Sequence, residues 1–219
     1  MQTYYEHAGI TIYHGDCREI LPLLPKVDAV ITDPPYGIRA DETRPTGPRG
    51  ALNGWKDYGD TSWDRERPSK EVFELILAAA PAQAIWGGNY FADLLPPTMG
   101  WLVWDKGQRD FSLADCELCW TSRQKAARVI TYCRSQARLE GKYHPTQKAL
   151  PVMKWCISQM GLPKTIVDPF MGSGTTLVAA KDLGLSAIGI EREEKYCAMA
   201  AERLAQEALN FAEILREAF

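Results

Sequence analysis

An aspartate, two prolines and a tyrosine follow directly after a short apolar run. The run is VDAVITD (27–33), and the tetrapeptide is Asp33-Pro34-Pro35-Tyr36. Its β-branched residues predict a buried strand, which must end at Asp33 because proline has no N–H to give to a sheet ladder. Open α/β sheets bind their ligands at the carboxyl ends of their strands. We therefore expect Asp33 and Tyr36 to face a ligand.

A second motif, TIVDPFMGSGTTLVAAK (165–181), predicts a strand, a glycine turn and a helix. Gly172 and Gly174 would let the backbone approach a ligand closely, and the helix N-terminus behind them offers free N–H groups. Asp168 would repel a phosphate but could bind an ammonium group. Glu191 ends the later strand SAIGIE, where an acid accepts hydrogen bonds from ribose hydroxyls. These features suit a nucleoside that carries an amino acid, S-adenosylmethionine; the alternative is an ordinary strand–turn–helix unit with incidental acids.

Strand and helix patterns alternate along the rest of the chain. Further strands are expected at AIWGG, WLVWDK, ELCWTS and VITYC, and helices at 69–80, 150–160, 174–183 and from 193 onward. Ser69 would cap the first of these helices, and the last has an apolar stripe from Cys197 to Leu215. This alternation implies a mostly parallel sheet covered on both faces. With 219 residues and 46% hydrophobic content, a single domain, 1–219, is expected.

Composition narrows the class of protein. The N-terminal MQTYYEHAGI has neither a basic leader nor an apolar core, so it is not read as a secretory signal. No stretch approaches the ~18 apolar residues of a membrane span. Six scattered cysteines are expected to be reduced, which indicates a cytoplasmic protein. Cys116 and Cys119 resemble half of a zinc site, but strand spacing would point them to opposite faces, so no metal is expected.

Two segments differ from the rest in composition. Residues 37–70 carry five glycines and three prolines, and a long stretch without regular structure is usually an active-site lid or disordered. Its position after Tyr36 favours the lid. The net charge is −3, yet residues 120–148 hold seven bases and one acid, and such segregation can attract phosphates to one face. A solvated basic loop is the other interpretation.

Both motifs resemble the signatures of the amino-group DNA methyltransferases, a D/N/S-P-P-Y/F/W tetrapeptide and an F-x-G-x-G turn. Asp33-Pro34-Pro35-Tyr36 and Phe170-Met171-Gly172-Ser173-Gly174 match them in full. The catalytic motif precedes the cofactor turn, which is similar to the permuted β group of this family. KYHPTQKALPVMKWC (142–156) resembles the H-P-T-Q-K-P segment of that group, with Ala149 in place of the usual proline, and HGDC (14–17) resembles its G-D element.

The resemblance implies a fold and a set of cofactor contacts. The fold would be that of S-adenosylmethionine-dependent methyltransferases, α/β and Rossmann-like, with seven mostly parallel strands and one antiparallel strand. S-adenosyl-L-methionine would meet Asp168 and the glycine turn at its methionine end, and Glu191 at its ribose. His144, Thr146 and Lys148 would line its carboxylate side, and Asp16, with the backbone of Cys17, its adenine. The implied cofactor residues are Asp16, Cys17, Asp33, His144, Thr146, Lys148, Asp168, Phe170, Met171, Gly172, Ser173, Gly174, Thr175, Thr176 and Glu191.

The resemblance also assigns catalysis to Asp33, Pro34, Pro35 and Tyr36. The exocyclic amine of adenine or cytosine is a weak nucleophile because its lone pair is delocalised into the ring. Hydrogen bonds to the Asp33 carboxylate and the Pro34 carbonyl would localise that pair by positioning and electrostatic stabilisation. Tyr36 would stack on the base, worth roughly 1–3 kcal/mol, once the base has left the duplex. Aspartate favours N6 of adenine, since N4-cytosine members more often carry serine.

Duplex DNA is the expected partner. Only 107–143 is available where β-group members insert a target-recognition region, so this basic segment and the lid are expected to contact phosphates. The expected DNA contacts are Arg39, Arg123, Lys125, Arg128, Arg134 and Arg138. So short an enzyme would read a short site, act as a homodimer or rely on a partner. The alternatives are amine methylation in RNA or protein, or a non-catalytic DNA-binding protein with a relic cofactor pocket.

Overall fold

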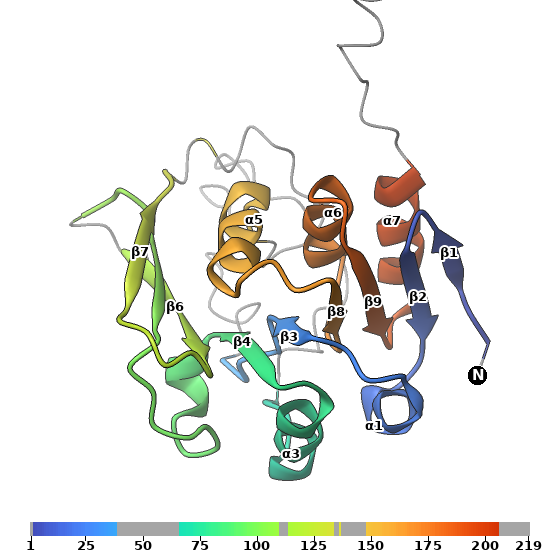
Figure 1. The fold of residues 1–219 in the computed structure, drawn as a ribbon, viewed down its shortest axis with the longest axis horizontal. Helices are drawn as coiled ribbons and strands as arrows, with labels where there is room; N and C mark the ends of the chain where they lie inside the picture. Colours follow the sequence, from blue (N-terminus) through green and yellow to red (C-terminus); the bar gives the residue numbers. More distant parts are fainter. Residues whose placement is uncertain (1, 39–65, 110–113, 134–135, 137–147, 206–219) are drawn as a thin grey trace, which may run out of the picture.

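The computed structural model describes residues 2–38, 66–109, 114–133, 136 and 148–205. These residues form a sheet with helices on both faces (Figure 1). The strands are β1 (Tyr5–His7), β2 (Ile10–His14), β3 (Ala29–Thr32), β4 (Ala82–Trp86), β5 (Leu102–Asp105), β6 (Cys116–Thr121), β7 (Arg128–Thr131), β8 (Thr165–Asp168) and β9 (Ser186–Glu191). The helices are α1 (Cys17–Ile20), η1 (Leu21–Leu23), α3 (Lys70–Ala79), η3 (Gly88–Phe91), α5 (Leu150–Gln159), α6 (Thr175–Asp182) and α7 (Glu194–Ala205).

The strand directions confirm a mostly parallel sheet. The order is β1-β2-β9-β8-β3-β4-β6-β5-β7. The run from β2 to β4 is parallel throughout, and β6 is antiparallel to both of its neighbours, β4 and β5. The reversed strand near one edge is therefore β6, but the described sheet has nine strands where the resemblance implies seven. The strands located from the sequence are β3 to β9, and the two that were not are β1 and β2, which pair antiparallel. The last strand, β7, is parallel to β5.

The catalytic tetrapeptide and the cofactor turn follow neighbouring strands. β3 and β8 pair in parallel, with Ala29 opposite Ile166 and Val30 opposite Val167. Their carboxyl ends therefore lie at one edge of the sheet, although the motifs that follow them are far apart in the chain. The permuted order of the motifs does not separate them in space.

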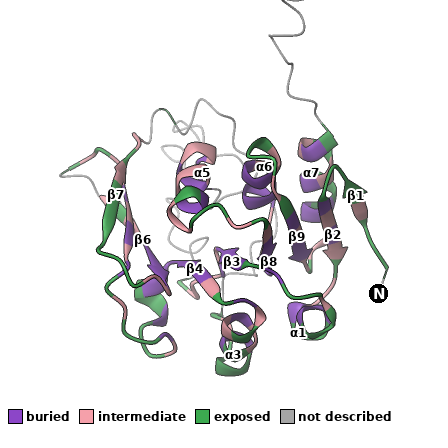
Figure 2. Cartoon of the chain, in the orientation of Figure 1, coloured by how far each residue is buried: buried purple, intermediate pink, exposed green. Residues whose placement is uncertain are grey.

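Helices cover the sheet on both faces, α5, α6 and α7 on one and α1 and α3 on the other (Figure 1). The faces of these helices that meet the sheet are buried, as are the central strands (Figure 2). Ser69 occupies the N-cap position of α3 as expected, but its side chain makes no capping hydrogen bond. In this helix Val72, Phe73 and Ile76 are buried, at a helical spacing that gives one apolar face. Each such side chain contributes about 1.5–3 kcal/mol by leaving water.

The expected strands and helices are all present in the described residues, with ends that differ by a few residues. In α7, Cys197, Ala200 and Leu204 are buried, and the rest of the expected stripe lies outside the described residues. The β1–β2 hairpin was not predicted. Its turn is Ala8-Gly9, both with positive φ (49° and 78°), the conformation that tight two-residue hairpin turns require.

Two further expectations concern membranes and metals. Within the part of the chain that the structure describes, no helix is long and apolar enough to cross a membrane. Cys116 is exposed and Cys119 is buried, so they do lie on opposite faces of β6. Most of the proposed lid, 37–70, and much of 107–143 fall outside the described residues.

Candidate active site

The carboxyl ends of β3, β8 and β9 border one cavity of about 570 Å³. It brings together residues that the sequence separates by more than a hundred positions. Predicted site residues that line it are Asp16, Cys17, Asp33, Pro35, Lys148, Asp168, Phe170, Met171, Gly172, Ser173, Thr175, Thr176 and Glu191. The described residue Gly174 is not in its lining; it caps α6 with φ 78° and packs against Ala200 of α7. His144 and Thr146 lie outside the described residues.

Asp168 is held at the end of β8 by neutral donors. One carboxylate oxygen accepts from the Thr32 hydroxyl at 2.7 Å and the Phe170 N–H at 3.1 Å, and the other from the Thr176 hydroxyl at 2.6 Å. Burial raises the pKa of Asp168 to about 6, while the bonds from Thr176 and Thr32 oppose this rise. A carboxylate has about four acceptor sites, so capacity remains for one further donor. The hydroxyl of Thr176, expected to touch the cofactor, is used here instead.

Glu191, at the end of β9, supports the glycine turn. Its carboxylate accepts the Gly172 N–H at 3.0 Å and the Glu193 N–H at 2.8 Å. Burial raises the pKa of this carboxyl, and the two backbone donors oppose the rise. The Arg203 guanidinium of α7 fixes the same turn from behind, 2.5 Å from the Ser173 carbonyl oxygen and 3.3 Å from the Thr175 hydroxyl. One acid and one helix therefore hold the turn in shape.

The start of α1 also lines the cavity, beside Glu191, whose carbonyl oxygen accepts the Gly15 N–H at 2.9 Å. Asp16 caps this short helix by accepting the Arg18 N–H at 2.8 Å, and its carboxylate also pairs with the Arg18 guanidinium. Hydrogen bonding from Arg18 lowers the pKa of Asp16. Cys17 is buried beside it, and burial raises the pKa of its thiol to about 11. Cys17 is thus a neutral packing residue whose backbone and side chain line the cavity.

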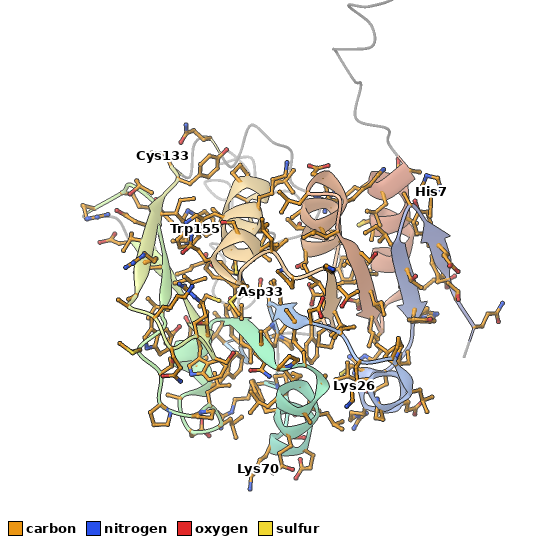
Figure 3. All side chains as sticks on the ribbon, in the orientation of Figure 1. His7, Lys26, Asp33, Lys70, Cys133 and Trp155 are labelled. Atoms are coloured by element: carbon orange, nitrogen blue, oxygen red, sulfur yellow. The ribbon has the colours of Figure 1, made fainter. Side chains whose placement is uncertain are left out.

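Asp33 lies near the centre of the molecule, below α5 in the view of Figure 3, with both carboxylate oxygens occupied by protein donors. Tyr36 donates its hydroxyl to Oδ1 at 2.5 Å, and the Lys148 ammonium donates to Oδ2 at 2.6 Å. The Lys148 side chain is only 4% exposed, and it also pairs with Glu117 at 3.0 Å. Lys148 lines the cavity, but its charge is directed at Asp33 rather than held free for a cofactor carboxylate.

Each of these charged groups changes the pKa of its neighbours. Burial raises the pKa of Asp33, and Lys148 opposes that rise. Burial alone would lower the pKa of Lys148, but the carboxylates of Asp33 and Glu117 outweigh it and raise the pKa well above its usual value. Burial would raise the pKa of Glu117, but Lys148 and Lys106 outweigh it and lower the pKa to about 2. The ion pairs therefore lower the pKa of Glu117 and raise that of Lys148, while at Asp33 they only reduce the rise that burial causes.

Tyr36 is packed rather than exposed to the cavity. Its ring stacks on Tyr90 of η3, with centroids 4.8 Å apart and planes at 17°. Gly87, with φ 69°, lies against the same ring, and a Cβ there would clash with it. Burial raises the pKa of the Tyr36 hydroxyl, and the neighbouring Asp33 adds to the rise. A base that stacks on Tyr36 must therefore displace Tyr90 or approach from another side, and the stacking role remains a prediction.

The predicted DNA contacts differ in exposure. Lys125 and Arg128 are exposed, next to and at the start of edge strand β7. Arg123 is half-buried, and its Nε and Nη1 atoms are buried without a hydrogen-bond partner among the described residues. This burial leaves Arg123 less available to a phosphate than expected. Arg39, Arg134 and Arg138 lie outside the described residues.

Two residues of the site were missed in the sequence, Glu117 and Lys106. Lys106 pairs with Glu117 at 2.7 Å, behind Lys148. The available signal was strand alternation, because Glu117 lies on the same face of β6 as the buried Cys119. A charged residue on an inward face needs a partner of opposite charge, but the sequence does not identify that partner.

Comparison with known proteins agrees with this arrangement. A family profile described as DNA methylase, covering N6 and N4 methyltransferases, matches residues 80–202. The Type II methyltransferase M.HinfI of Haemophilus influenzae is 28% identical over 251 residues, covering 89% of this chain and 68% of that protein. The Type II methyltransferase M.ScaI of Streptomyces caespitosus is 26% identical over 263 residues, covering 94% and 84%.

Solved structures share the fold. The crystal structure of the M1.HpyAVI–SAM complex has a TM-score of 0.61 at 24% identity, covering 90% of this chain and 100% of that chain. The cytosine-N4-specific PvuII DNA methyltransferase has a TM-score of 0.59 at 16% identity, covering 98% and 94%. At these identities the likeness concerns the fold alone, and it confirms the methyltransferase fold expected from the sequence.

Proposed function

We propose a specific reaction for this chain, which belongs to the N6/N4 DNA methylase family: methyl transfer from S-adenosylmethionine to the N6 amine of an adenine in DNA. The observation that carries the proposal is the shared cavity. Asp33 of the catalytic tetrapeptide and Asp168, with the turn after it, line the same space. A methyl donor held at the turn and an amine held at Asp33 would therefore meet without a barrier of protein between them.

The cavity suits S-adenosylmethionine. Its volume of about 570 Å³ is within the ~300–1,000 Å³ of small-molecule sites. Asp168 keeps acceptor capacity for an ammonium group, and Glu191 lies at the strand end where an acid binds ribose hydroxyls. When bound, S-adenosylmethionine would supply an electrophilic methyl group: the N–C bond would form as the methyl–sulfur bond breaks, the neutral thioether S-adenosylhomocysteine would leave, and the proton lost by the nitrogen would pass to Asp33 or to water.

The chain's own part in the reaction is to hold the amine. The Asp33 carboxylate is held by Lys148 and can accept one N–H of the amine in place of the Tyr36 hydroxyl. The Pro34 carbonyl would accept the other, since the two prolines fix its direction. Removing the lone pair from conjugation in this way is electrostatic stabilisation, worth about 10²- to 10³-fold in rate per hydrogen-bonding group at comparable sites.

Two features support DNA as the substrate and adenine as the target. The named relatives are Type II methyltransferases, and the exposed Lys125 and Arg128 are suited to phosphate contacts. Aspartate at position 33 favours adenine, because N4-cytosine members of the family more often carry serine there. The chemistry itself would serve the N4 amine of cytosine equally well.

The test is methyl transfer from labelled S-adenosylmethionine to unmethylated duplex DNA, followed by nucleoside analysis. N6-methyladenine that is lost in Asp33→Ala supports the proposal. N4-methylcytosine would keep the mechanism and replace the base. Cofactor binding without product on DNA would contradict the DNA substrate and direct the search to RNA or protein amines.

A further inference from the structure

Four charged side chains, all buried or half-buried, form a row of alternating sign that ends at Asp33 of the catalytic tetrapeptide. Lys106, just after β5, pairs with Glu117 of β6 at 2.7 Å, and Glu117 pairs with Lys148 at 3.0 Å. Lys148, just before α5, pairs with Asp33 at the end of β3 at 2.6 Å. Charges of both signs are present in equal number, so the row is neutral as a whole. It crosses from the far strands of the sheet to the catalytic carboxylate.

Lys148 is the member of the row that touches the tetrapeptide. Its Nζ lies 2.6 Å from Asp33 Oδ2, 3.0 Å from the Tyr36 hydroxyl and 3.0 Å from Glu117 Oε2. Two of the three N–H donors of the ammonium group are directed at Asp33 and Tyr36, whereas Glu117 Oε2 is an ion-pair partner that accepts no hydrogen bond within the described residues. The same Nζ lies 5.5 Å from the ring centroid of Tyr36 and 5.6 Å from that of Trp86, which favours a cation at this point.

The two oxygens of Asp33 are therefore unequal. Oδ2 is bound by a charged group that is itself anchored on Glu117, whereas Oδ1 is bound by the neutral hydroxyl of Tyr36. Both contacts are assisted by the charge of the carboxylate, but only the contact at Oδ2 joins two opposite charges, in an ion pair whose lysine side chain is 4% exposed. An incoming amine would thus replace Tyr36 at Oδ1 more readily than it would replace Lys148 at Oδ2.

We propose that Lys148 and Glu117 are positioning residues for the reaction: Lys148 holds Asp33 by Oδ2 so that Oδ1 is presented to the target amine, and Glu117 holds Lys148. This inference rests on the function proposed above. Glu117 also limits how strongly Lys148 binds Asp33, because the lysine charge is shared between two carboxylates. Asp33 consequently remains a good acceptor for the amine instead of being neutralised.

Other groups near Asp33 do not provide this arrangement. Tyr36 is a neutral hydroxyl, and Asp168 of the neighbouring strand β8 is a carboxyl whose oxygens are bound by Thr32, Thr176 and Phe170. The free thiol of Cys119 faces Lys148 from β6 and is hydrogen-bonded to the thiol of Cys156 of α5. Burial raises the pKa of the Cys119 thiol well above its usual value. Lys148 is therefore the cation that meets Asp33 among the described residues.

The test compares Lys148→Met, Lys148→Arg and Glu117→Gln by the pH dependence of kcat for methyl transfer. Lys148→Met removes a positive neighbour of Asp33, so the acidic limb of the profile should move up by about one pH unit or more. Glu117→Gln removes a negative neighbour, so the limb should move down. Lys148→Arg should keep the limb within about 0.3 unit and restore part of the rate. A purely structural role would lower the amount of active enzyme without moving the limb in opposite directions.

A matched control is Lys154→Met, which breaks the ion pair with Asp182 on the outer side of the same helix α5. This variant should leave the acidic limb in place and should change kcat by no more than about twofold. Circular dichroism would show whether each variant folds. If Lys148→Met does not fold, the inference is still tested by Glu117→Gln, whose acidic limb must move to lower pH. The inference would be overturned if the acidic limb stayed in place in both Lys148→Met and Glu117→Gln, or if it moved in the same direction in both variants.

A second readout needs neither DNA nor cofactor. Carbon-13 NMR of aspartate-labelled protein, with the Asp33 signal identified by its loss in Asp33→Asn, gives the pKa of Asp33 directly. We expect it to rise in Lys148→Met and fall in Glu117→Gln. If the wild type transfers no methyl group to DNA, the proposed function fails while this measurement still decides the role of Lys148. If the wild type is active and the Asp33 pKa is unmoved, the inference alone fails.

Discussion

The cofactor turn and the catalytic tetrapeptide both depend on buried carboxylates, but the groups that hold these carboxylates differ. At the turn, Asp168 and Glu191 accept hydrogen bonds from hydroxyls and backbone N–H groups. Behind the tetrapeptide, Glu117 and Asp33 meet lysine ammonium groups. Burial therefore raises the pKa of Asp168 to about 6, whereas Lys148 and Lys106 outweigh burial and lower the pKa of Glu117 to about 2.

This difference separates two tasks. Neutral donors hold a carboxylate in place while leaving its charge for a ligand, which suits a site that binds a cationic cofactor. Ammonium groups oppose the rise in carboxylate pKa that burial causes: at Asp33 Lys148 reduces this rise, and at Glu117 two lysines outweigh it. Such a neighbour favours the ionised form, which a group that accepts N–H bonds from an amine needs. It follows that mutations in the ion pairs around Asp33 should lower stability and kcat more than mutations at the turn do. Mutations at the turn should change the affinity for the cofactor and the pH dependence of stability.

The largest effect is expected for Lys148→Ala. It leaves Glu117 and Asp33 buried without their shared cation, and breaking one partner of a buried ion pair costs about 3–5 kcal/mol of stability. Asp168→Asn, which loses hydrogen-bond acceptor capacity at a neutral network, should cost only about 1–3 kcal/mol. Urea unfolding of both variants measures the difference. Equal costs would remove the distinction between the two sides.

The next effect concerns activity. Asp33→Asn should lower kcat about 10²- to 10³-fold, the usual effect of losing one electrostatic contact to the reacting group. The affinity for S-adenosylmethionine should stay within about twofold, because Asp33 is not needed to hold the turn. Titration calorimetry and methyl-transfer rates on the same preparation measure both. A large loss of cofactor affinity would place Asp33 on the cofactor side as well.

The sequence predicted the turn better than the ionic row, for a physical reason. Asp168, its glycines and Glu191 lie within one strand–turn–helix–strand unit, so local spacing is enough to bring them together. The pair Lys148 and Asp33 is 115 residues apart, and Glu117 joins them only because β6 reverses direction beside β4. No local pattern encodes that reversal, so Lys148 was assigned to the cofactor carboxylate alone and Glu117 was not assigned.

Helices and strands also followed the rule that local sequence patterns can be predicted and long-range contacts cannot. Strand and helix positions were predictable because burial imposes a period on each segment. The N-terminal edge was the part that was missed, because β1 is only three residues long and carries no strong apolar pattern. The other edge strand, β7, was predicted as VITYC although it is mostly exposed. The β1–β2 hairpin was signalled by the alternation of Ile10 and Ile12 after Gly9, a signal weaker than that of the central strands.

A pH experiment sharpens the comparison further. Burial raises the pKa of Asp168 in the folded protein from the usual 3.8 to about 6, so its contribution to stability is present below about pH 4 and is lost as pH rises through 6. Two pKa units correspond to about 3 kcal/mol. Asp168→Asn should flatten this decline in urea unfolding between pH 4 and 6.5. Glu117 should act in the opposite sense, since its pKa is lowered to about 2 and its stabilisation is lost only as pH falls from about 4.5 to 2. An unchanged slope in Asp168→Asn would show that Asp168 is not the group that titrates.

The smallest effect is expected for Glu191→Gln. An amide has one acceptor oxygen in place of two, so its NH₂ would face either the Gly172 N–H or the Glu193 N–H that the carboxylate now accepts. Loss of one such bond, about 0.5–1.5 kcal/mol, should weaken S-adenosylmethionine binding by up to about tenfold. At saturating cofactor, kcat should remain within about threefold, because the row behind Asp33 is untouched. Glu194→Gln, in the exposed first turn of α7, is the matched control and should change neither quantity. A fall in kcat equal to that of Asp33→Asn would mean that the turn shapes the amine site as well as the cofactor site, and the two sides would then have to be treated as one.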